Sequence, residues 1–472
     1  MFLALNGCLK MGPDFRRPET GIRTPESFQH ATTGSERLLA DDQWWRVFNQ
    51  PELDLLVEEV LKNNPDIKGA TARILEMQSQ FIRARADRLP ALNLQGQVQR
   101  QRQTINAPVV TPMGIIQQER RKTTDSHGLS LPASFELDLW GRVARAEEAA
   151  RADLLQAEEN RRTVAQTMVA ETINLYLKIE SFERRIRITK ESIKNYGKSL
   201  ALVTSRYRRG LAGILDLRQA RRTLAWAEAS LPVLRQELGI AQQGLAVLVG
   251  RYPEARPART QPEDYFKRLS PVPSGLPSEV LLRRPDIRAA EAGLKALNAR
   301  LGVAMASRFP GITLTGGFGY SSEELNRLFK PQSELWNLAL GIVQPIFDGG
   351  RLKAGQRAAE ARYEQGVAEY AKTVLNAFYE VESALLTRRE QLERRDRVLN
   401  FLTEARATQR IAESRYGRGL VDYITVLDAQ QTRFQAEENL VLVDLAILGN
   451  RVTLHRALGG GWAEPGPVKE KY

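Results

Sequence analysis

The sequence predicts a mainly α-helical protein with a small β part, in which long coiled-coil hairpins and pairs of strands are each encoded twice. Three observations predict it: an internal repeat, very long helical patterns without proline, and segments whose apolar residues alternate. The repeat is clearest where Ser205–Leu231 reads SRYRRGLAGILDLRQARRTLAWAEASL and Ser414–Leu440 reads SRYGRGLVDYITVLDAQQTRFQAEENL, a separation of 414 − 205 = 209 positions. Each copy ends one helical pattern at a glycine and soon starts another, which is typical of a helix hairpin.

The composition excludes several classes of function. The net charge is +12, from 68 Lys and Arg against 56 Asp and Glu, but the basic residues are dispersed among the carboxylates, which argues against a nucleic-acid partner. Three His and one Cys leave no ligand set for zinc, no disulfide and no Cys/His nucleophile pair. The run Gly349-Gly350-Arg351 lacks the Lys-Ser/Thr of a phosphate-binding loop. We therefore expect no enzyme activity, no cofactor and no metal site.

The first forty residues carry the only targeting-like feature. Leu5-Asn6-Gly7-Cys8 resembles a bacterial lipobox, in which the cysteine thiol takes lipid; the alternative is that Cys8 is an ordinary free thiol. Residues 9–40 are rich in Pro, Gly, Thr and charge, which predicts an extended arm. The sequence contains no run of about 18 apolar residues, so no membrane-spanning helix is predicted.

The first repeat is assigned to residues 41–250 and the second to 278–460, with a linker at 251–277 and a tail at 461–472. The first repeat opens with a predicted amphipathic equatorial helix over 41–63, which is expected to pack on the body. A helix of about 22 residues follows from Pro65 and has a counterpart at Pro285, because proline is tolerated at a helix start.

A β-hairpin is predicted after each of these helices, at about 91–140 and 311–347, where apolar residues alternate with small or polar ones. Each strand has about 10 residues, which is enough to cross a bilayer when tilted. Half of a soluble β-sandwich would show the same alternation of apolar residues, so that alternative stays open. Pro132 fits poorly inside a paired strand. The repeat offset falls from 285 − 65 = 220 to 209, so the first hairpin is longer by 11 residues around 99–124, and we expect an exposed loop there.

The long helices are expected to be coiled coils. Arg142–Tyr207 contains no proline, and its apolar seam from Leu175 to Tyr207 advances in steps of four and three. Such a helix is on the order of 100 Å long. Pro232 is expected to kink or interrupt the helix that returns from the first tip. The two tips are placed at about 205–217 and 414–426. A single soluble coiled coil would bury these seams equally well.

Several motifs together carry a family resemblance. They are Gly12-Pro13-Asp14-Phe15 with Pro18, Trp44-Trp45 with Phe48 and Pro51, the two Pro-Asp-Ile helix starts, Asp138-Leu139-Trp140-Gly141-Arg142, Pro345-Ile346-Phe347-Asp348-Gly349-Gly350-Arg351, the two tips, and Ala457-Leu458-Gly459-Gly460-Gly461-Trp462. With these motifs the chain resembles a TolC-like outer-membrane factor of the NodT/OprM-like efflux lipoprotein group. The resemblance extends from Cys8 to Trp462.

The resemblance implies a homotrimer whose chains each donate four strands to a barrel of 3 × 4 = 12 strands in the outer membrane. The helices then form a periplasmic tunnel, and Cys8 carries a lipid anchor. The implied function is the outer-membrane channel of a tripartite efflux system, with a periplasmic membrane-fusion adaptor and an inner-membrane pump, expected to be of the RND type. The alternatives are the exit duct of a type I secretion system, a soluble periplasmic coiled-coil scaffold, and a nucleic-acid binder.

By the same resemblance, Ile424 and Asp428 line a periplasmic gate, and Tyr416 and Gly419 shape its turn. Three Asp428 carboxylates in a trimer would form a ring that attracts cations; the alternative is that Asp428 makes a solvated ion pair along its helix. The expected tip and adaptor contact consists of Tyr207, Arg209, Gly210, Leu211, Tyr416, Arg418, Gly419 and Leu420, which otherwise are simply turn formers. Opening is expected to untwist the tips, and bonds made by Tyr416 and Arg418 are expected to hold the tips closed.

Overall fold

The computed structural model describes residues 10–19, 21–23, 25–30, 43–112, 114–253, 280 and 283–460. Cys8, most of the linker and the tail from residue 461 lie outside the described residues. The chain forms two compact units, which we call the sheet unit (Met1–Pro18, Ile74–Gln156 and Glu291–Glu369) and the tip unit (Glu19–Arg73, Ala157–Ala290 and Tyr370–Tyr472). Each unit takes segments from both halves of the sequence. The division at the repeat boundaries stays a prediction.

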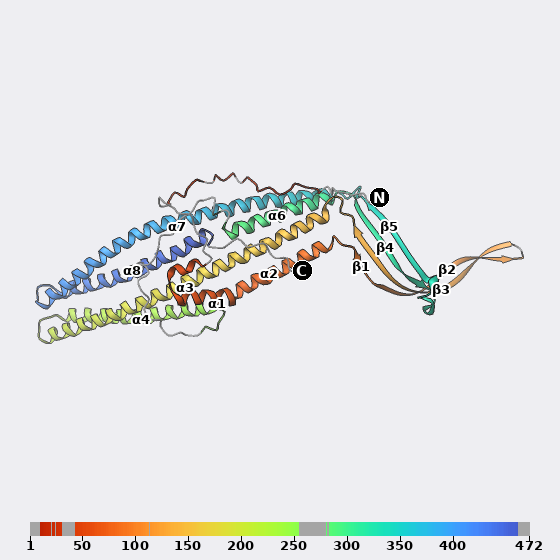
Figure 1. The fold of residues 1–472 in the computed structure, drawn as a ribbon. Helices are drawn as coiled ribbons and strands as arrows, with labels where there is room; N and C mark the ends of the chain where they lie inside the picture. The colour runs from red at the N-terminus through yellow and green to blue at the C-terminus, as the bar shows by residue number, and fades with distance from the viewer. Residues whose placement is uncertain are drawn as a thin grey trace. The chain divides into compact units, whose positions relative to one another are not determined.

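The sheet unit contains one antiparallel sheet (Figure 1). Its strands are β1 (Ala91–Leu92), β2 (Gln95–Thr111), β3 (Gly114–Glu136), β4 (Gly311–Ser322) and β5 (Glu334–Val343), with the short 3-10 turns η3 (Leu325–Arg327) and η4 (Pro331–Ser333) between β4 and β5. Both β1 and β2 pair with β3, which pairs with β4, which pairs with β5. In the described part of the chain, the first and last strand positions therefore each have one edge without a pairing strand.

The five strand segments form four strand positions because β1 and β2 are one strand with a break at Asn93 and Leu94. The break lies opposite Pro132, which has no N–H to donate, and the Pro132 carbonyl accepts a hydrogen bond from the Asn93 N–H at 3.0 Å. Pro132 still pairs with Gly317 on the β4 side. A proline in a central strand is thus accommodated by interrupting the neighbouring strand.

The longer first hairpin is not a loop, as the sequence suggested, but a two-stranded ribbon. Strands β2 and β3 pair from Gln95↔Ser130 to Thr111↔Gly114, whereas β3 and β4 pair only as far as His127↔Ser322. The ribbon therefore continues beyond the ends of β4 and β5 (Figure 1). Polar side chains are stable there because the extra backbone groups are satisfied by the ribbon's own ladder.

The helices that flank the strands begin where the sequence predicts. Helices α2 (Pro65–Ala86) and α6 (Pro285–Ala306) each have 22 residues and start at the proline. The long helices α3 (Arg142–Arg208) and α7 (Arg351–Gly417) are each capped by an aspartate of the family motifs: Asp138 accepts the Ala144 N–H at 2.7 Å, and Asp348 accepts the Leu352 N–H at 2.8 Å. The backbone N–H groups of Leu352 and Gly350 lower the pKa of the Asp348 carboxyl.

The predicted equatorial helix is two elements, the 3-10 turn η1 (Trp44–Phe48) and α1 (Pro51–Asn63). They separate because Asn49 adopts a left-handed conformation, with φ of 50°, and Pro51 starts a new helix. Their apolar side chains join α3, α4 (Ile214–Val249) and α8 (Tyr423–Ala457) in the main core of the tip unit. The prediction that this segment packs on the body is confirmed.

The two long helices have 67 residues each, as long as the sequence predicts, and return through α4 and α8 of 36 and 35 residues. The expected interruption at Pro232 is wrong, because α4 runs through that residue. The predicted seam of α3 is buried at Ile179, Phe182, Tyr196 and Val203. Among the described helices, none has an 18-residue stretch apolar enough to cross a membrane.

Candidate gate at the helix-turn-helix tips

Both tips reverse the chain with the same turn. At the first tip the Leu211 N–H donates to the Arg206 carbonyl at 2.9 Å, and Gly210 has φ of 73°. At the second tip the Leu420 N–H donates to the Arg415 carbonyl at 3.0 Å, and Gly419 has φ of 78°. This pattern is a Schellman ending, which needs a left-handed residue and therefore favours glycine. The repeat thus encodes two turns of one geometry.

The side chains of the two tips differ although the sequences match. Tyr416 is 5% exposed, whereas its counterpart Tyr207 is 41% exposed. The Tyr416 ring lies 5.5 Å from the ring of Tyr423, and both belong to a core cluster that joins the two hairpins through Val203, Leu217, Ala220, Ala412, Val426, Leu427 and Ala429. Burial raises the pKa of the Tyr423 phenol to about 12. The second tip is therefore anchored in the core and Tyr207 is not.

Arg206 of the first tip bonds to the second tip. Its Nη1 atom donates to the Tyr416 carbonyl at 2.8 Å, and its guanidinium lies 4.7 Å from the centre of the Tyr416 ring. The Tyr416 and Gly417 carbonyls belong to the last turn of α7, whose carbonyls have no partner within the helix and carry a partial negative charge. The Tyr416 carbonyl also accepts the Gly419 N–H of the turn at 2.9 Å. Arg206 therefore caps α7 from the neighbouring hairpin. Its counterpart Arg415 is exposed.

Three further polar contacts join the hairpins away from the tips. Gln430 donates to Ser199 at 2.8 Å, Arg185 donates to Glu438 at 2.6 Å, and Arg184 donates to Asp444 at 3.1 Å. Burial raises the pKa of the Glu438 carboxyl, and Arg185 partly offsets this. Asp444 is 3% exposed and also accepts a bond from Arg395 of α7 at 2.8 Å. One carboxylate thus ties α3, α7 and α8 together.

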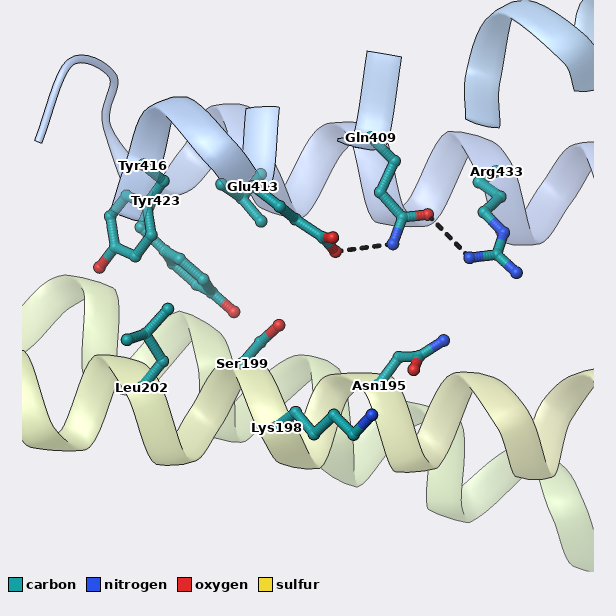
Figure 2. A pocket seen from close by; sticks show the side chains of 10 residues that line it. Asn195, Lys198, Ser199, Leu202, Gln409, Glu413, Tyr416, Tyr423 and Arg433 are labelled. Atoms are coloured by element: carbon teal, nitrogen blue, oxygen red, sulfur yellow. Dashed lines mark hydrogen bonds between the residues drawn. The ribbon is translucent and has the colours of Figure 1, made fainter. Parts of the chain in front are cut away.

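A pocket of about 330 Å³ lies between the hairpins, close to the tips. Figure 2 shows α3 on one side, with Ser199 and Lys198, and α7 and α8 on the other, where Gln409 bonds to Glu413 and Arg433. The hairpins are therefore in close contact at the tyrosines and less tightly packed behind them. A movement of one hairpin against the other needs such space, because close-packed helices cannot slide.

Ile424 and Asp428 lie four residues apart on the exposed face of α8. Ile424 is 51% exposed, and no hydrogen bond or ion pair joins Asp428 to another described residue. The alternative of an ion pair along the helix therefore finds no partner for Asp428 in the described part of the chain. An apolar side chain and a carboxylate are both free to meet other molecules.

The residues of the expected adaptor contact are exposed in the structure, with one exception. Arg209, Gly210, Leu211, Arg418, Gly419 and Leu420 are exposed at the turns, and Tyr207 is exposed on the last turn of α3, but Tyr416 is buried. The expected bonds of Tyr416 and Arg418 are not present, since the Tyr416 hydroxyl and the Arg418 side chain have no partner among the described residues. The contact between the two tips is made by Arg206 instead. The sequence did not reveal this, because an arginine stands at the same position of both tips.

Replacing Tyr416 with phenylalanine is expected to change little. The buried Tyr416 hydroxyl has no described hydrogen-bond partner, so its removal should leave the free energy of unfolding unchanged or raise it by up to about 1 kcal/mol. Tyr416→Ala should lower it by about 3 kcal/mol, since it empties a packed site. Thermal unfolding followed by circular dichroism checks both, with Tyr207→Phe as control. A large loss of unfolding free energy in Tyr416→Phe would contradict the conclusion that the Tyr416 hydroxyl makes no hydrogen bond to a described residue.

The described residues contain no group of three His, Cys, Asp or Glu side chains placed to hold a metal ion. The model of the family described as outer membrane efflux protein matches residues 56–251 and 276–460. The chain belongs to this family. It is the outer-membrane channel component of a tripartite efflux system, and the members of the family are channels.

Individual relatives agree along nearly the whole length. The cation efflux system protein CusC of Escherichia coli is 32% identical over 465 residues, covering 98% of this chain and 97% of CusC. The probable outer membrane lipoprotein SilC of Salmonella typhimurium is 33% identical over 468 residues, covering 98% and 97%. The solved structure of the outer-membrane channel OprN superposes with a TM-score of 0.87 at 29% identity, covering 96% of this chain and 99% of OprN. The TolC-like fold predicted from the sequence is confirmed.

Proposed function

We propose that three copies of this efflux channel assemble into one conduit, in which the sheets close a 12-stranded barrel and the long helices form a periplasmic tunnel. The observation that carries this is the open sheet. Among the described residues, no strand pairs with the outer edge of β1 and β2 or with the outer edge of β5. Unpaired backbone groups are not tolerated in hydrocarbon, so the edges must pair with other copies. Leu338, Leu340 and Ile342 on β5 are exposed and suit a lipid-facing surface.

The assembly is tested by determining the mass of the detergent-purified protein by light scattering, together with its insertion into planar bilayers. A mass of three chains and discrete conducting steps are expected. A stable monomer that never inserts would overturn the proposal and favour a soluble scaffold.

The gate is proposed to lie at Ile424 and Asp428 of the second tip. In a trimer, three Asp428 carboxylates form a ring that attracts cations, and three Ile424 side chains one turn away form an apolar ring that hinders water. The exposure of both side chains on one face of α8 supports this. Their counterparts in the first repeat, Leu215 and Gln219, carry no charge. The first tip is therefore not proposed as a cation filter.

Asp428→Asn should lower the cation selectivity of the channel, because it removes the charge and keeps the size of the side chain. We expect the permeability ratio of K⁺ over Cl⁻, taken from reversal potentials in a salt gradient, to fall several-fold. Gln219→Ala is the matched control in the first repeat and should keep the selectivity of the wild type. Unchanged selectivity in Asp428→Asn would place the filter elsewhere.

Opening is proposed to be an untwisting of the hairpins, driven by a periplasmic membrane-fusion adaptor that works with an inner-membrane pump of the RND type. Leu211 and Leu420 are each about two-thirds exposed at the turns and offer the adaptor an apolar contact, with Arg209 and Arg418 beside them. Tyr207 extends this surface. Tyr416 does not, because it is buried.

Leu211→Ser combined with Leu420→Ser is expected to weaken adaptor binding at least about tenfold. Burying one leucine side chain in the contact contributes on the order of 1.5 kcal/mol to the free energy of binding. Binding of the detergent-purified channel to its immobilised adaptor measures this. Leu155→Ser, on an exposed site far from the turns in the sequence, is the control. Equal binding by the double variant would remove the turns from the contact.

Cys8 is proposed to carry a lipid anchor, supported by its lipobox-like surroundings and by the naming of SilC as a lipoprotein. Incorporation of labelled palmitate by the wild type, lost in Cys8→Ser, is the expected result. Equal incorporation by both would rule out this cysteine.

A further inference from the structure

The ribbon formed by β2 and β3 carries basic side chains that the channel function does not use. Beyond the last pair of β3 with β4, the ribbon continues from Gln99↔Ser126 to Thr111↔Gly114. Arg100, Arg102, Arg121 and Lys122 lie on this part and are exposed. Like charges close together on a polar ribbon do not stabilise it, so these cations call for a function.

The register brings three of these cations onto one face. Arg100 pairs with Asp125, Arg102 with Thr123, and Thr104 with Arg121. Because alternate residues of a strand point to the same face, Arg100, Arg102 and Arg121 lie on one side of the ribbon, and Lys122 lies on the other. The described carboxylates on this face are Asp125, 3.3 Å from Arg100, whose side chain is still 76% exposed, and the exposed Glu119, which pairs with Asn106. The three arginines outnumber these two carboxylates. No described residue bonds to the side chain of Arg102, Arg121 or Lys122.

The ribbon lies at the end of the sheet that faces away from the helices. Strand β1 follows α2, β3 leads to α3, β4 follows α6 and β5 leads to α7. These four helices therefore join the end of the sheet opposite the ribbon. With the tunnel in the periplasm, the ribbon lies on the outer side of the membrane. This placement rests on the proposed function.

Aromatic side chains mark the level of the outer membrane surface. The rings of Phe318, Tyr320 and Phe329 are linked by centroid distances of 5.7 and 5.6 Å, and Phe318 pairs with Trp336. Aromatic girdles of this kind lie at the interfaces of membrane barrels. Tyr320 is level with Leu129 and Gly96, so Arg100 and Arg102 lie about 14 and 20 Å further along the strand, at about 3.4 Å per residue. With a strand tilt of about 40°, they stand at roughly 10 to 15 Å above the girdle.

We propose that this basic face of the ribbon binds the phosphate groups of glycolipids in the outer leaflet of the outer membrane. The height fits, since phosphorylated headgroups begin directly above the hydrocarbon. The chemistry fits as well: arginine binds phosphate through two parallel N–H donors, and neighbouring arginines can hold one phosphate from two sides. Three ribbons around a trimer would bind several glycolipids at once and hold the channel in place.

The test uses trimers of the full chain that have first been shown to conduct in planar bilayers. They are incubated with mixed micelles that contain lipopolysaccharide, or the same lipopolysaccharide after enzymatic removal of its phosphates, and the retained lipid is measured by mass spectrometry. The variant replaces Arg100, Arg102, Arg121 and Lys122 with glutamine. A second variant replaces the three arginines with lysine and keeps the charge. Arg327→Gln, an exposed arginine between β4 and β5, is the control.

We expect the wild type and Arg327→Gln to retain at least about tenfold more phosphorylated than dephosphorylated lipid. The glutamine variant should lose this preference, the lysine variant should keep part of it, and conductance should not change. Equal retention of both lipids by the wild type, or unchanged retention by the glutamine variant, would overturn this inference alone. A wild-type protein that does not conduct would overturn the proposed function and with it the placement of the ribbon.

Discussion

Arg206→Ala is expected to open the channel at rest. The substitution removes a charged hydrogen bond of 2.8 Å to the Tyr416 carbonyl and a cation–π contact of 4.7 Å. Together these contribute about 2 kcal/mol per chain at a partly exposed site. Because 1.4 kcal/mol corresponds to a factor of ten, the equilibrium constant between the closed and open states should shift towards open on the order of thirtyfold for each chain. Mean conductance in planar bilayers should therefore rise several-fold or more.

The repeat supplies the control for this experiment. Arg415→Ala removes the same residue from the same turn of the second tip, where it is exposed and has no described partner. It should conduct like the wild type. Arg206→Lys should lie between the two, since lysine keeps the charge and loses the flat stacking surface. If Arg206→Ala and Arg415→Ala behaved alike, the contact between the hairpins would not hold the gate.

Asp444→Ala is expected to destabilise the tip unit by about 3 kcal/mol or more. It removes the buried carboxylate that Arg184 and Arg395 share, and breaking a buried ion pair from one side is costly. A fall in the thermal midpoint of several degrees should be seen by calorimetry. The variant should also conduct more at rest, because Arg184 and Asp444 join the two hairpins.

Glu390→Ala is the control for Asp444, since Glu390 pairs with Arg389 on the surface, where both side chains are more than half exposed. Such a pair contributes at most about 1 kcal/mol. Replacing Asp444, Arg184 and Arg395 together with apolar residues should recover part of the stability, because the arginines that Asp444 compensates are then removed with it. A midpoint equal to that of the wild type in Asp444→Ala would contradict the assignment.

Much of the fold was predictable because its signals are local. The prolines at 65 and 285, the glycines at 210 and 419 and the alternation over 311–322 each act on the backbone where they stand. The break of the equatorial helix was also local, but a left-handed Asn49 has only a weak signal. The ribbon was missed because polar residues occupy both faces over most of its length, so no regular apolar alternation marks its strands.

The candidate gate was predictable only in part, because its contacts lie between segments far apart in sequence. Ile424 and Asp428 could be named from the family resemblance, and the structure leaves them exposed. Arg206 and Asp444 could not be named. Arg206 matches Arg415 in the repeat, and only the packing of one hairpin on the other distinguishes them. Identical residues at the two tips thus make different contacts.

The most direct test of a channel that is closed at rest is the single-channel conductance of the wild-type protein in a planar bilayer without its adaptor, recorded beside Arg206→Ala. We expect small, cation-selective currents for the wild type and much larger currents for the variant. Large currents of equal size from both proteins would contradict it, because the tips would then not close the tunnel.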